Sequence, residues 1–168
     1  MSVDRITWVR IEGFRSIEDL TIHLDGLQVL IGENGAGKST IVEAFELLRK
    51  ASATRDFGGT VAREHGGLSE LLRVGAARLR LSVGFRLAGD DHEFTYALAM
   101  QSSVSSPLPV IVEESLDPFF SRDAESAVFL TSSGAPGRIN VRTDKLSPAD
   151  TGLLALWGAD APEPFARF

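Results

Sequence analysis

Residues 27–45 read LQVLIGENGAGKSTIVEAF, and this stretch decides the fold. Within it, Gly32-Glu33-Asn34-Gly35-Ala36-Gly37-Lys38-Ser39 matches the phosphate-loop pattern G-x-x-x-x-G-K-[ST] at every fixed position. The run before the motif, 27–31, is short and almost entirely apolar, which predicts a strand buried on both faces. Apolar residues recur at helical spacing over 38–52, which predicts an amphipathic helix. The motif therefore has the strand–loop–helix context that a phosphate loop requires.

The residue types of this loop suit the binding of a nucleotide's phosphates. Gly35 and Gly37 allow the backbone to curl until successive N–H groups face one anion. The start of the following helix adds its partial positive charge. Lys38 can neutralise the β- and γ-phosphates, and the Ser39 hydroxyl can ligate Mg²⁺. The expected contacts within the motif are Glu33, Asn34, Gly35, Ala36, Gly37, Lys38, Ser39 and Thr40.

On the N-terminal side of the motif the sequence predicts an antiparallel ribbon. Residues 5–12, RITWVRIE, are rich in β-branched and aromatic side chains and end at Gly13, which indicates a strand and a turn. Leu20, Ile22 and Leu24 then alternate with polar residues, as in a half-buried strand, and a turn signal follows at 25–26.

On the C-terminal side the sequence predicts a loop over 53–67 and then a β-meander. Strict alternation over 77–87 is followed by the hairpin signal 89–91 and by a second alternating run over 94–100. The apolar runs 109–113 and 127–131, and the alternation around 139–141, extend the meander. A capped helix is expected between Ser147 and Gly158. The expected division is 1–52 (ribbon, phosphate loop and first helix), 53–145 (loop and meander) and 146–168 (helix and a truncated connection to a missing C-terminal half).

Composition excludes several classes of protein. The 168 residues are 43% hydrophobic and 24% charged, which suits one globular domain. No apolar run approaches the roughly 20 residues of a membrane-spanning helix. With no cysteine there is no disulfide framework or thiolate metal site, and a cytoplasmic location is expected.

The charge balance does not favour nucleic acid. There are 17 Lys and Arg against 23 Asp and Glu, a formal charge of −6, so no bulk basic footprint is visible. Arg78, Arg80 and Arg86 alternate along one run and have two readings, a basic stripe toward nucleic acid or the solvated outer face of a sheet. We favour the second because the total charge is acidic.

Three blocks carry a family resemblance: Ile11-Glu12-Gly13-Phe14-Arg15-Ser16, then Leu30 to Thr40, then Glu43-Ala44-Phe45. Together they resemble the N-terminus of RecF/SMC-like ATPases, whose heads are of the ABC type, and most of all the bacterial ATPases grouped with the OLD family. The resemblance implies an α/β fold class, a P-loop NTPase ABC-type half-head with an antiparallel β-subdomain. It implies ATP and Mg²⁺ as cofactors and Lys38 as the catalytic residue.

The resemblance also implies roles outside the loop. In this family the N-terminal ribbon covers the nucleotide, and the arginine after the Gly-Phe turn approaches it; here that residue is Arg15, with an exposed turn arginine as the alternative. The complete head would hydrolyse ATP, with hydrolysis coupled to homodimer formation through the nucleotide and to a DNA transaction in repair or phage defence. No membrane is implied.

For the Walker B, signature and Q-loop motifs that hydrolysis requires, the sequence contains only segments or residues that partly match. Pro109-Val110-Ile111-Val112-Glu113-Glu114 resembles a Walker B strand but lacks its Asp, so an ordinary meander strand is favoured. Leu130-Thr131-Ser132-Ser133-Gly134 resembles a signature motif but precedes a strand pattern rather than a helix. Gln101 is the candidate for a Q-loop metal ligand, against the favoured reading of a polar residue at a hairpin end.

Two other functions remain open. The first is a binding module in which nucleotide promotes assembly without turnover, which the missing Walker B motif supports. The second is a small P-loop kinase, disfavoured because the meander leaves little chain for a lid and an acceptor site. A GTPase is disfavoured further because no Asn-Lys-x-Asp motif occurs.

Overall fold

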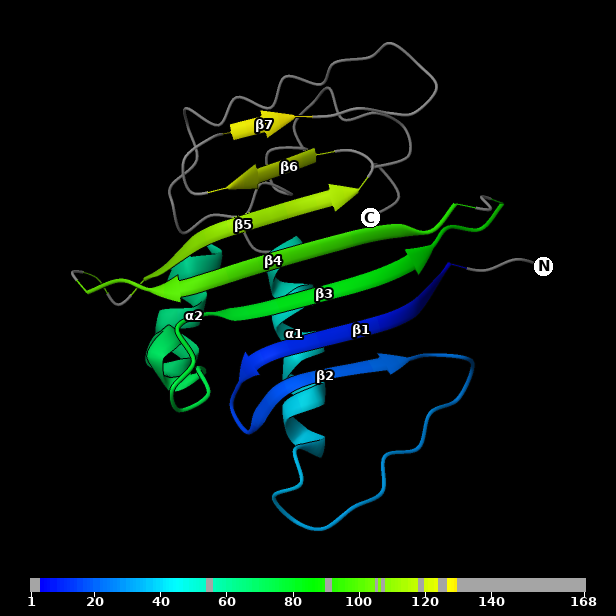
Figure 1. Cartoon of the computed structure of the whole chain (residues 1–168), viewed down its shortest axis with the longest axis horizontal. Helices are drawn as coiled ribbons and strands as arrows, with labels where there is room; N and C mark the ends of the chain where they lie inside the picture. Colours follow the sequence, from blue (N-terminus) through cyan, green and yellow to red (C-terminus); the bar gives the residue numbers. More distant parts are fainter. Residues whose placement is uncertain are drawn as a thin grey trace.

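The computed structural model describes residues 4–53, 56–89, 92–104, 106, 108–117, 120–123 and 127–129, with the backbone alone from 116 onward. Its main feature is a seven-stranded sheet in this part of the chain, with the order β2-β1-β3-β4-β5-β6-β7 and antiparallel pairing throughout (Figure 1). The strands are β1 (Arg5–Phe14), β2 (Ile17–His23), β3 (Leu79–Arg86), β4 (Phe94–Ser102), β5 (Pro109–Asp117), β6 (Phe120–Asp123) and β7 (Ala127–Phe129).

The predicted ribbon and meander are confirmed within these residues. β1 pairs with β2 through a tight turn in which Phe14 lies opposite Ile17. β3 inserts beside β1, so the ribbon and the meander form one continuous sheet. The alternation around 139–141 and the helix expected between Ser147 and Gly158 lie outside the described residues.

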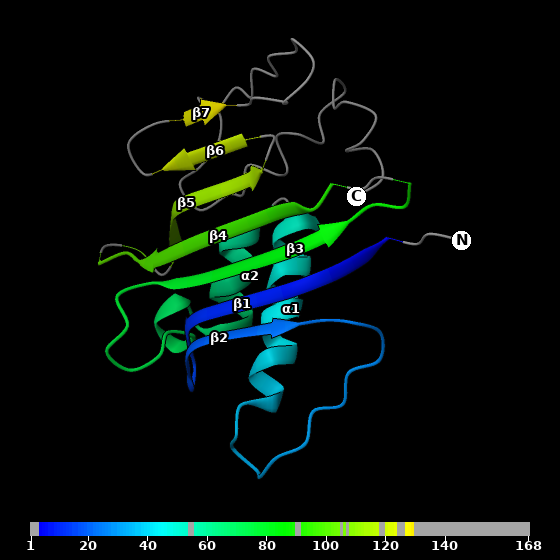
Figure 2. The ribbon, with the colours of Figure 1, turned by 45° about the vertical axis from the view of Figure 1, so that its right-hand side comes forward.

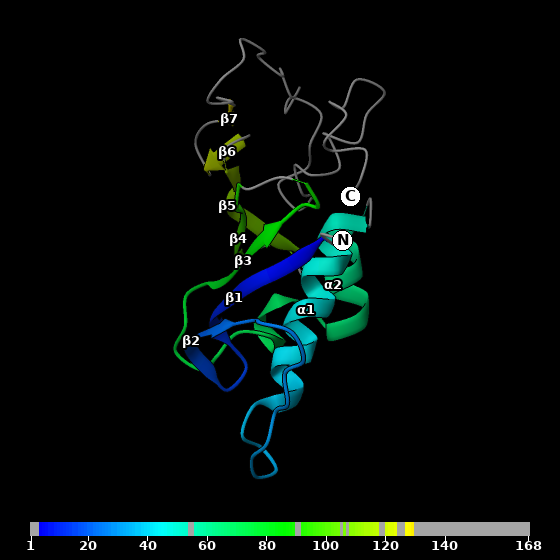
Figure 3. The ribbon, with the colours of Figure 1, turned by 90° about the vertical axis from the view of Figure 1, so that its right-hand side faces the viewer.

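Two helices, α1 (Lys38–Ala53) and α2 (Phe57–His65), lie on one face of the sheet, as Figures 2 and 3 show from two directions. Alternate strand residues such as Val9, Ile11, Leu81 and Leu98 are completely buried on this face. The helices contribute further apolar side chains to the same core, among them Ile41, Ala44, Leu47, Leu48, Ala51, Phe57 and Val61. The phosphate-loop helix therefore packs on an antiparallel β-subdomain, and the predicted α/β fold class is confirmed.

Helix α2 corrects the prediction of a loop over 53–67. The Asp56 carboxylate accepts a hydrogen bond from the Gly59 N–H at 3.0 Å and caps the helix start. Gly66 ends the helix in the left-handed region, with φ of 77°. Paired glycines weaken the helical pattern in the sequence, but the burial of Phe57 and Val61 supplies the stability that local propensity does not.

The segment 27–31 corrects a second prediction. It has no regular secondary structure, and its side chains are exposed rather than buried, with Leu27 at 92% and Ile31 at 91%. A strand buried on both faces needs a hydrogen-bonded neighbour and a covering layer on each side. No strand of the described chain pairs with this segment, because each one pairs only within the β2-to-β7 sheet.

Candidate nucleotide-binding site

The phosphate loop, residues 32–39, runs into the first turn of α1. Gly35 and Gly37 have φ of 86° and 89°, a region that favours glycine, and their backbones curl the loop as its composition requires. The Ala36 N–H donates to the Glu33 carbonyl at 3.2 Å, which forms a turn at the tip. The Ile41 N–H donates to the Gly37 carbonyl at 3.1 Å and begins the helix. The loop therefore places a curled backbone directly before a helix N-terminus.

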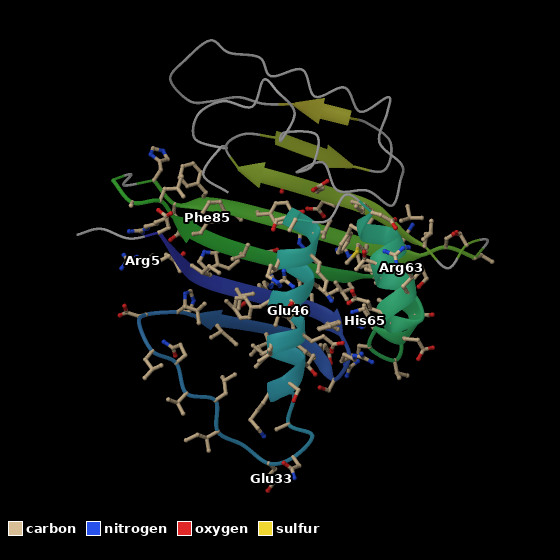
Figure 4. The ribbon with its side chains drawn as sticks, turned by 180° about the vertical axis from the view of Figure 1, so that it is seen from behind. Arg5, Glu33, Glu46, Arg63, His65 and Phe85 are labelled. Carbon is tan, nitrogen blue, oxygen red and sulfur yellow. The ribbon has the colours of Figure 1, made fainter. Side chains whose placement is uncertain are left out.

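Lys38 lies across the loop. Its ammonium nitrogen donates to the carbonyl oxygens of Gly32 at 2.7 Å and Glu33 at 2.6 Å. An ammonium group has three N–H donors, so one remains for a phosphate oxygen. The predicted contacts Glu33, Asn34, Gly35, Ala36 and Ser39 are exposed, and Gly37, Lys38 and Thr40 are half-buried. Figure 4 shows Glu33 at the tip of the loop, away from the sheet.

The turn between β1 and β2 lies against the base of this loop. A Cβ atom added to Gly37 would lie 3.3 Å from the Ser16 hydroxyl oxygen and 3.7 Å from Ile17. Ser16 is exposed and follows Arg15 directly. Sequence reasoning did not assign a role to Ser16, although it belongs to the quoted Gly-Phe-Arg-Ser block. In the structure its hydroxyl oxygen is the atom nearest to the position that a Cβ on Gly37 would take.

Arg15 binds protein acceptors in this structure. Its Nε and one terminal nitrogen donate to the two Glu43 carboxylate oxygens at 3.1 and 2.7 Å, and its other terminal nitrogen donates to the Glu70 carbonyl at 2.9 Å. The Glu43 hydrogen bonds raise the pKa of Arg15 above its ordinary value. His65 at the end of α2 also approaches Glu43, with Nδ1 at 3.4 Å, and Figure 4 shows it between the two helices.

The two predicted metal ligands lie in different places. Ser39 is exposed in the first turn of α1. Gln101 is exposed near the end of β4, opposite Val110 of β5, and Figure 1 shows this end of β4 at a different edge of the molecule from the start of α1. The structure therefore does not bring Gln101 to the loop. Within the described ranges, no group of three or more His, Asp or Glu side chains could hold a metal ion.

The Walker B imitation lies in β5, between β4 and β6. Glu113 pairs with Arg80 at 2.6 Å, and Glu114 is fully buried and accepts a hydrogen bond from the Tyr96 hydroxyl at 2.9 Å. These contacts agree with the favoured reading of an ordinary meander strand. The signature imitation, 130–134, lies outside the described residues.

The alternating arginines of β3 face acidic partners. Arg80 contacts Glu113 and, at 3.7 Å, Glu12, and Arg86 contacts Glu93 at 3.4 Å. Because these guanidinium groups are matched by carboxylates, the sheet face agrees with the solvated outer surface favoured from the charge balance. Arg78, just before β3, is exposed.

The described part of the chain contains two α-helices, α1 and α2. Neither α1 nor α2 is long and apolar enough to cross a bilayer.

This chain is similar to known proteins, and the matched residues of one family model include both the ribbon and the phosphate loop. Over 87 residues the chain is 32% identical to the DNA double-strand break repair Rad50 ATPase of Sulfolobus acidocaldarius, an alignment that covers 50% of this chain and 9% of the relative. Over 78 residues it is 41% identical to the DNA repair protein RecN of Bacillus subtilis, covering 46% and 11%. The chain thus spans about a tenth of the length of these relatives.

Among solved structures, one concerned with "ATP-driven dimerization and DNA stimulated activation of SMC ATPases" aligns with a TM-score of 0.49 and 21% identity, covering 67% of this chain and 69% of the other. The Rad50 and RecN relatives confirm the resemblance to RecF/SMC-like ATPases. A family model described as AAA ATPase domain matches residues 5–105, which is more than half of the chain, and the chain therefore belongs to the AAA ATPase domain family.

Proposed function

We propose that this chain binds ATP with Mg²⁺ at residues 32–39 and is the nucleotide-binding part of an ATPase that hydrolyses ATP. The observation that carries the proposal is the loop itself. Two glycines with positive φ curl the backbone, α1 begins at Lys38, and the Lys38 ammonium lies across the loop with a donor to spare. Membership of an ATPase family supports the choice of ATP over other phosphates.

The residues present fit a magnesium ion that arrives with the nucleotide. Mg²⁺ keeps several waters and takes one or two protein oxygens together with phosphate oxygens, so a dedicated cage of carboxylates is not needed. The exposed Ser39 hydroxyl, at the end of the loop, is the protein ligand that we assign. When bound, the ion would neutralise charge on the β- and γ-phosphates. Lys38 and the loop N–H groups would orient those phosphates from the other side.

We propose further that the site is completed by polypeptide outside the described residues. Support comes from 27–31, where Leu27, Val29 and Ile31 expose 92%, 70% and 91% of their surface, and from Val42 on α1, which exposes 59%. Large apolar side chains that flank a binding loop in the sequence are costly to leave in water. Strands that pair with 27–31 would cover them. The division into 1–52, 53–145 and 146–168, with the last a connection to a C-terminal half, belongs to this proposal.

Hydrolysis in the complete head is proposed to accompany homodimer formation through the nucleotide and a DNA transaction in repair or phage defence. The names of the relatives, a DNA double-strand break repair ATPase and a DNA repair protein, support the DNA part. We place the protein in the cytoplasm, where such transactions occur in bacteria and archaea. The paired arginines of β3 do not support DNA binding on that sheet face.

The second candidate is a nucleotide-gated assembly module without turnover. The observation that favours it is the placement of Glu113 and Glu114, which contact Arg80 and Tyr96 within the meander. Neither carboxylate is thereby available to position a water at the loop. No specific observation favours the small P-loop kinase.

Binding and turnover by the purified chain test these proposals. A fluorescent ATP analogue is titrated with and without Mg²⁺, and phosphate release is followed at protein concentrations that permit dimers. We expect Mg²⁺-dependent binding and release no faster than background, because loss of a water-positioning or charge-clamping group costs about 10³–10⁵ in rate. Absence of binding by the folded chain would refute the site. Turnover on the order of 1 s⁻¹ would refute the need for completion, and a nucleotide-dependent increase in mass without turnover would favour the assembly module.

A further inference from the structure

Backbone hydrogen bonds to residues 71–73 hold the turn that carries Arg15. The Arg15 N–H donates to the Leu71 carbonyl at 2.8 Å, and the Arg73 N–H donates to the Gly13 carbonyl at 2.9 Å. A bridge between Phe14 and Leu72 lies between these two bonds. Phe14 and Leu71 are completely buried. The turn is therefore a fixed part of the sheet, against which a helix could be aligned.

Arg15 has a backbone conformation that its residue type disfavours. Its φ is 53°, and it is the one residue other than glycine with a positive φ among those described. A conformation of this kind persists where surrounding contacts over-determine it. Here those contacts include the side chain, because the guanidinium spans from the turn to Glu43 of α1 and to the Glu70 carbonyl.

Glu43 connects this turn to the phosphate loop. It lies five residues after Lys38, about 7.5 Å further along the helix axis. The same carboxylate is approached by His65 of α2 at 3.4 Å. Glu43 and Arg15 are only partly exposed, at 26% and 39% of their side chains. The first two turns of α1 are thus tied, at one carboxylate, to both the β1–β2 turn and α2.

We propose that Arg15 and Glu43 are a pair of positioning residues that hold α1, and with it the phosphate loop, in the binding-competent position. Arg15 then acts on the nucleotide through α1, since three of its five N–H donors are held by Glu43 and by the Glu70 carbonyl. Whether the two remaining N–H groups add a phosphate contact is decided by comparing ATP with ADP. Because a loop that is already ordered loses less freedom when ligand binds, releasing the pair weakens binding of any nucleotide that uses the loop. This inference rests on the proposed binding of ATP at residues 32–39.

A direct contact of Arg15 with a phosphate and the positioning of α1 by the Arg15–Glu43 pair predict different effects on ATP and ADP binding. If Arg15 contacted the γ-phosphate, its removal would weaken ATP but not ADP, and removal of Glu43 would free the guanidinium and strengthen ATP binding. If the pair positions α1, either removal weakens ATP and ADP by the same factor. In a double-mutant cycle, the second substitution then adds little to the first.

The experiment measures dissociation constants for fluorescent ATP and ADP analogues in Arg15→Gly, Glu43→Gln and the double variant. Glycine is chosen at position 15 because it adopts positive φ without strain. Glutamine preserves the shape of Glu43, so the fold should survive, and circular dichroism checks it. We expect each single variant to bind both nucleotides roughly fivefold to thirtyfold more weakly, with strong non-additivity in the double variant. The charge exchange Arg15→Glu/Glu43→Arg should recover part of the loss.

The chain provides a matched control in Arg10 and Asp19. This pair has the same two-point geometry, at 2.9 and 2.8 Å, but joins β1 to β2 and does not contact α1. Asp19→Asn and Arg10→Ala should leave both dissociation constants unchanged. Three results would overturn the positioning role. Arg15→Gly could lose affinity for ATP alone, or both single variants could bind both nucleotides as tightly as the unaltered chain. The third is that the control variants lose as much affinity as the single variants. Failure of the proposed function is a separate result, because the unaltered chain would then bind neither nucleotide.

Discussion

The ammonium nitrogen of Lys38 lies 2.6 Å from the carbonyl oxygen of Glu33, so the side chain that is expected to meet phosphate also closes the loop that presents it. A charged donor on a carbonyl makes one of the stronger hydrogen bonds in proteins. The lysine is therefore held in place before any ligand arrives. A phosphate that enters the loop meets an ammonium group whose position is already determined.

Lys38→Ala should lower the affinity for ATP by one to two decades, because a charge-assisted contact of this kind contributes about 1.5–3 kcal/mol. The fold should remain intact, since Lys38 is only half-buried at the start of α1 and the core does not include it. Titration with a fluorescent ATP analogue measures the change. Arg49→Ala is the control, because Arg49 is exposed on the same helix and pairs with Glu46. Unchanged affinity in well-folded Lys38→Ala would remove the phosphate-loop assignment.

Glu113→Gln and Glu114→Gln should leave Mg²⁺-dependent ATP binding unchanged, because β5 lies in the meander, with β4 and β6 as its neighbours. Both substitutions preserve shape. Replacement of Glu113 weakens a partly exposed ion pair with Arg80, which contributes little to stability. Titrations with and without Mg²⁺ measure the outcome. Loss of the Mg²⁺ dependence in either variant would show that the Walker B imitation is functional.

Gly84→Ala should destabilise the sheet through Trp8. A Cβ atom at position 84 would lie 2.1 Å from the indole nitrogen, which itself donates to Glu93 at 3.2 Å. Displacing the ring should cost about 1–3 kcal/mol, as other overpacking substitutions do. Chemical denaturation measures the free energy of unfolding. In a Trp8→Ala background the same substitution should cost much less, and an equal cost in both backgrounds would contradict the steric cause.

Asp56→Ala should lower the melting temperature at neutral pH, and this difference from the unaltered chain should shrink in acid. The ion pair with Arg63, followed by the hydrogen bond from the Gly59 N–H, lowers the pKa of Asp56 below its ordinary value near 3.8. A depressed pKa means that the ionised group stabilises the fold above its unfolded-state pKa and loses this effect as pH falls through the folded-state pKa.

Melting curves of both proteins at neutral pH and from about pH 4 downward test the Asp56 prediction. Asp56→Asn is the informative control, because the amide oxygen still caps α2 but has no charge. It should show an intermediate melting temperature at neutral pH. A difference between Asp56→Ala and the unaltered chain that is constant across pH would show that the charge contributes nothing.

The strands could be predicted because their signal is local. In β3 and β4 every second side chain is apolar, and this period of two is sufficient to indicate which face is buried. Helix α2 could not be predicted in the same way, because two consecutive glycines hide its pattern. Its stability comes from the Asp56 cap and from core packing, and only the second of these depends on distant parts of the chain.

In the candidate site, too, some features depend on local sequence and others on contacts between distant parts of the chain. By itself the sequence determined the phosphate loop, because the glycines, the lysine and the helix start act through backbone geometry within eight consecutive residues. Only the tertiary structure decided that Arg15 binds Glu43, 28 residues away, and that Ser16 lies against the loop. It also decided that the apolar segment 27–31 is exposed, because a strand exists only where a neighbouring strand accepts and donates its hydrogen bonds. Residue type determines what a side chain can bind, but which partner it meets depends on how distant parts of the chain pack together.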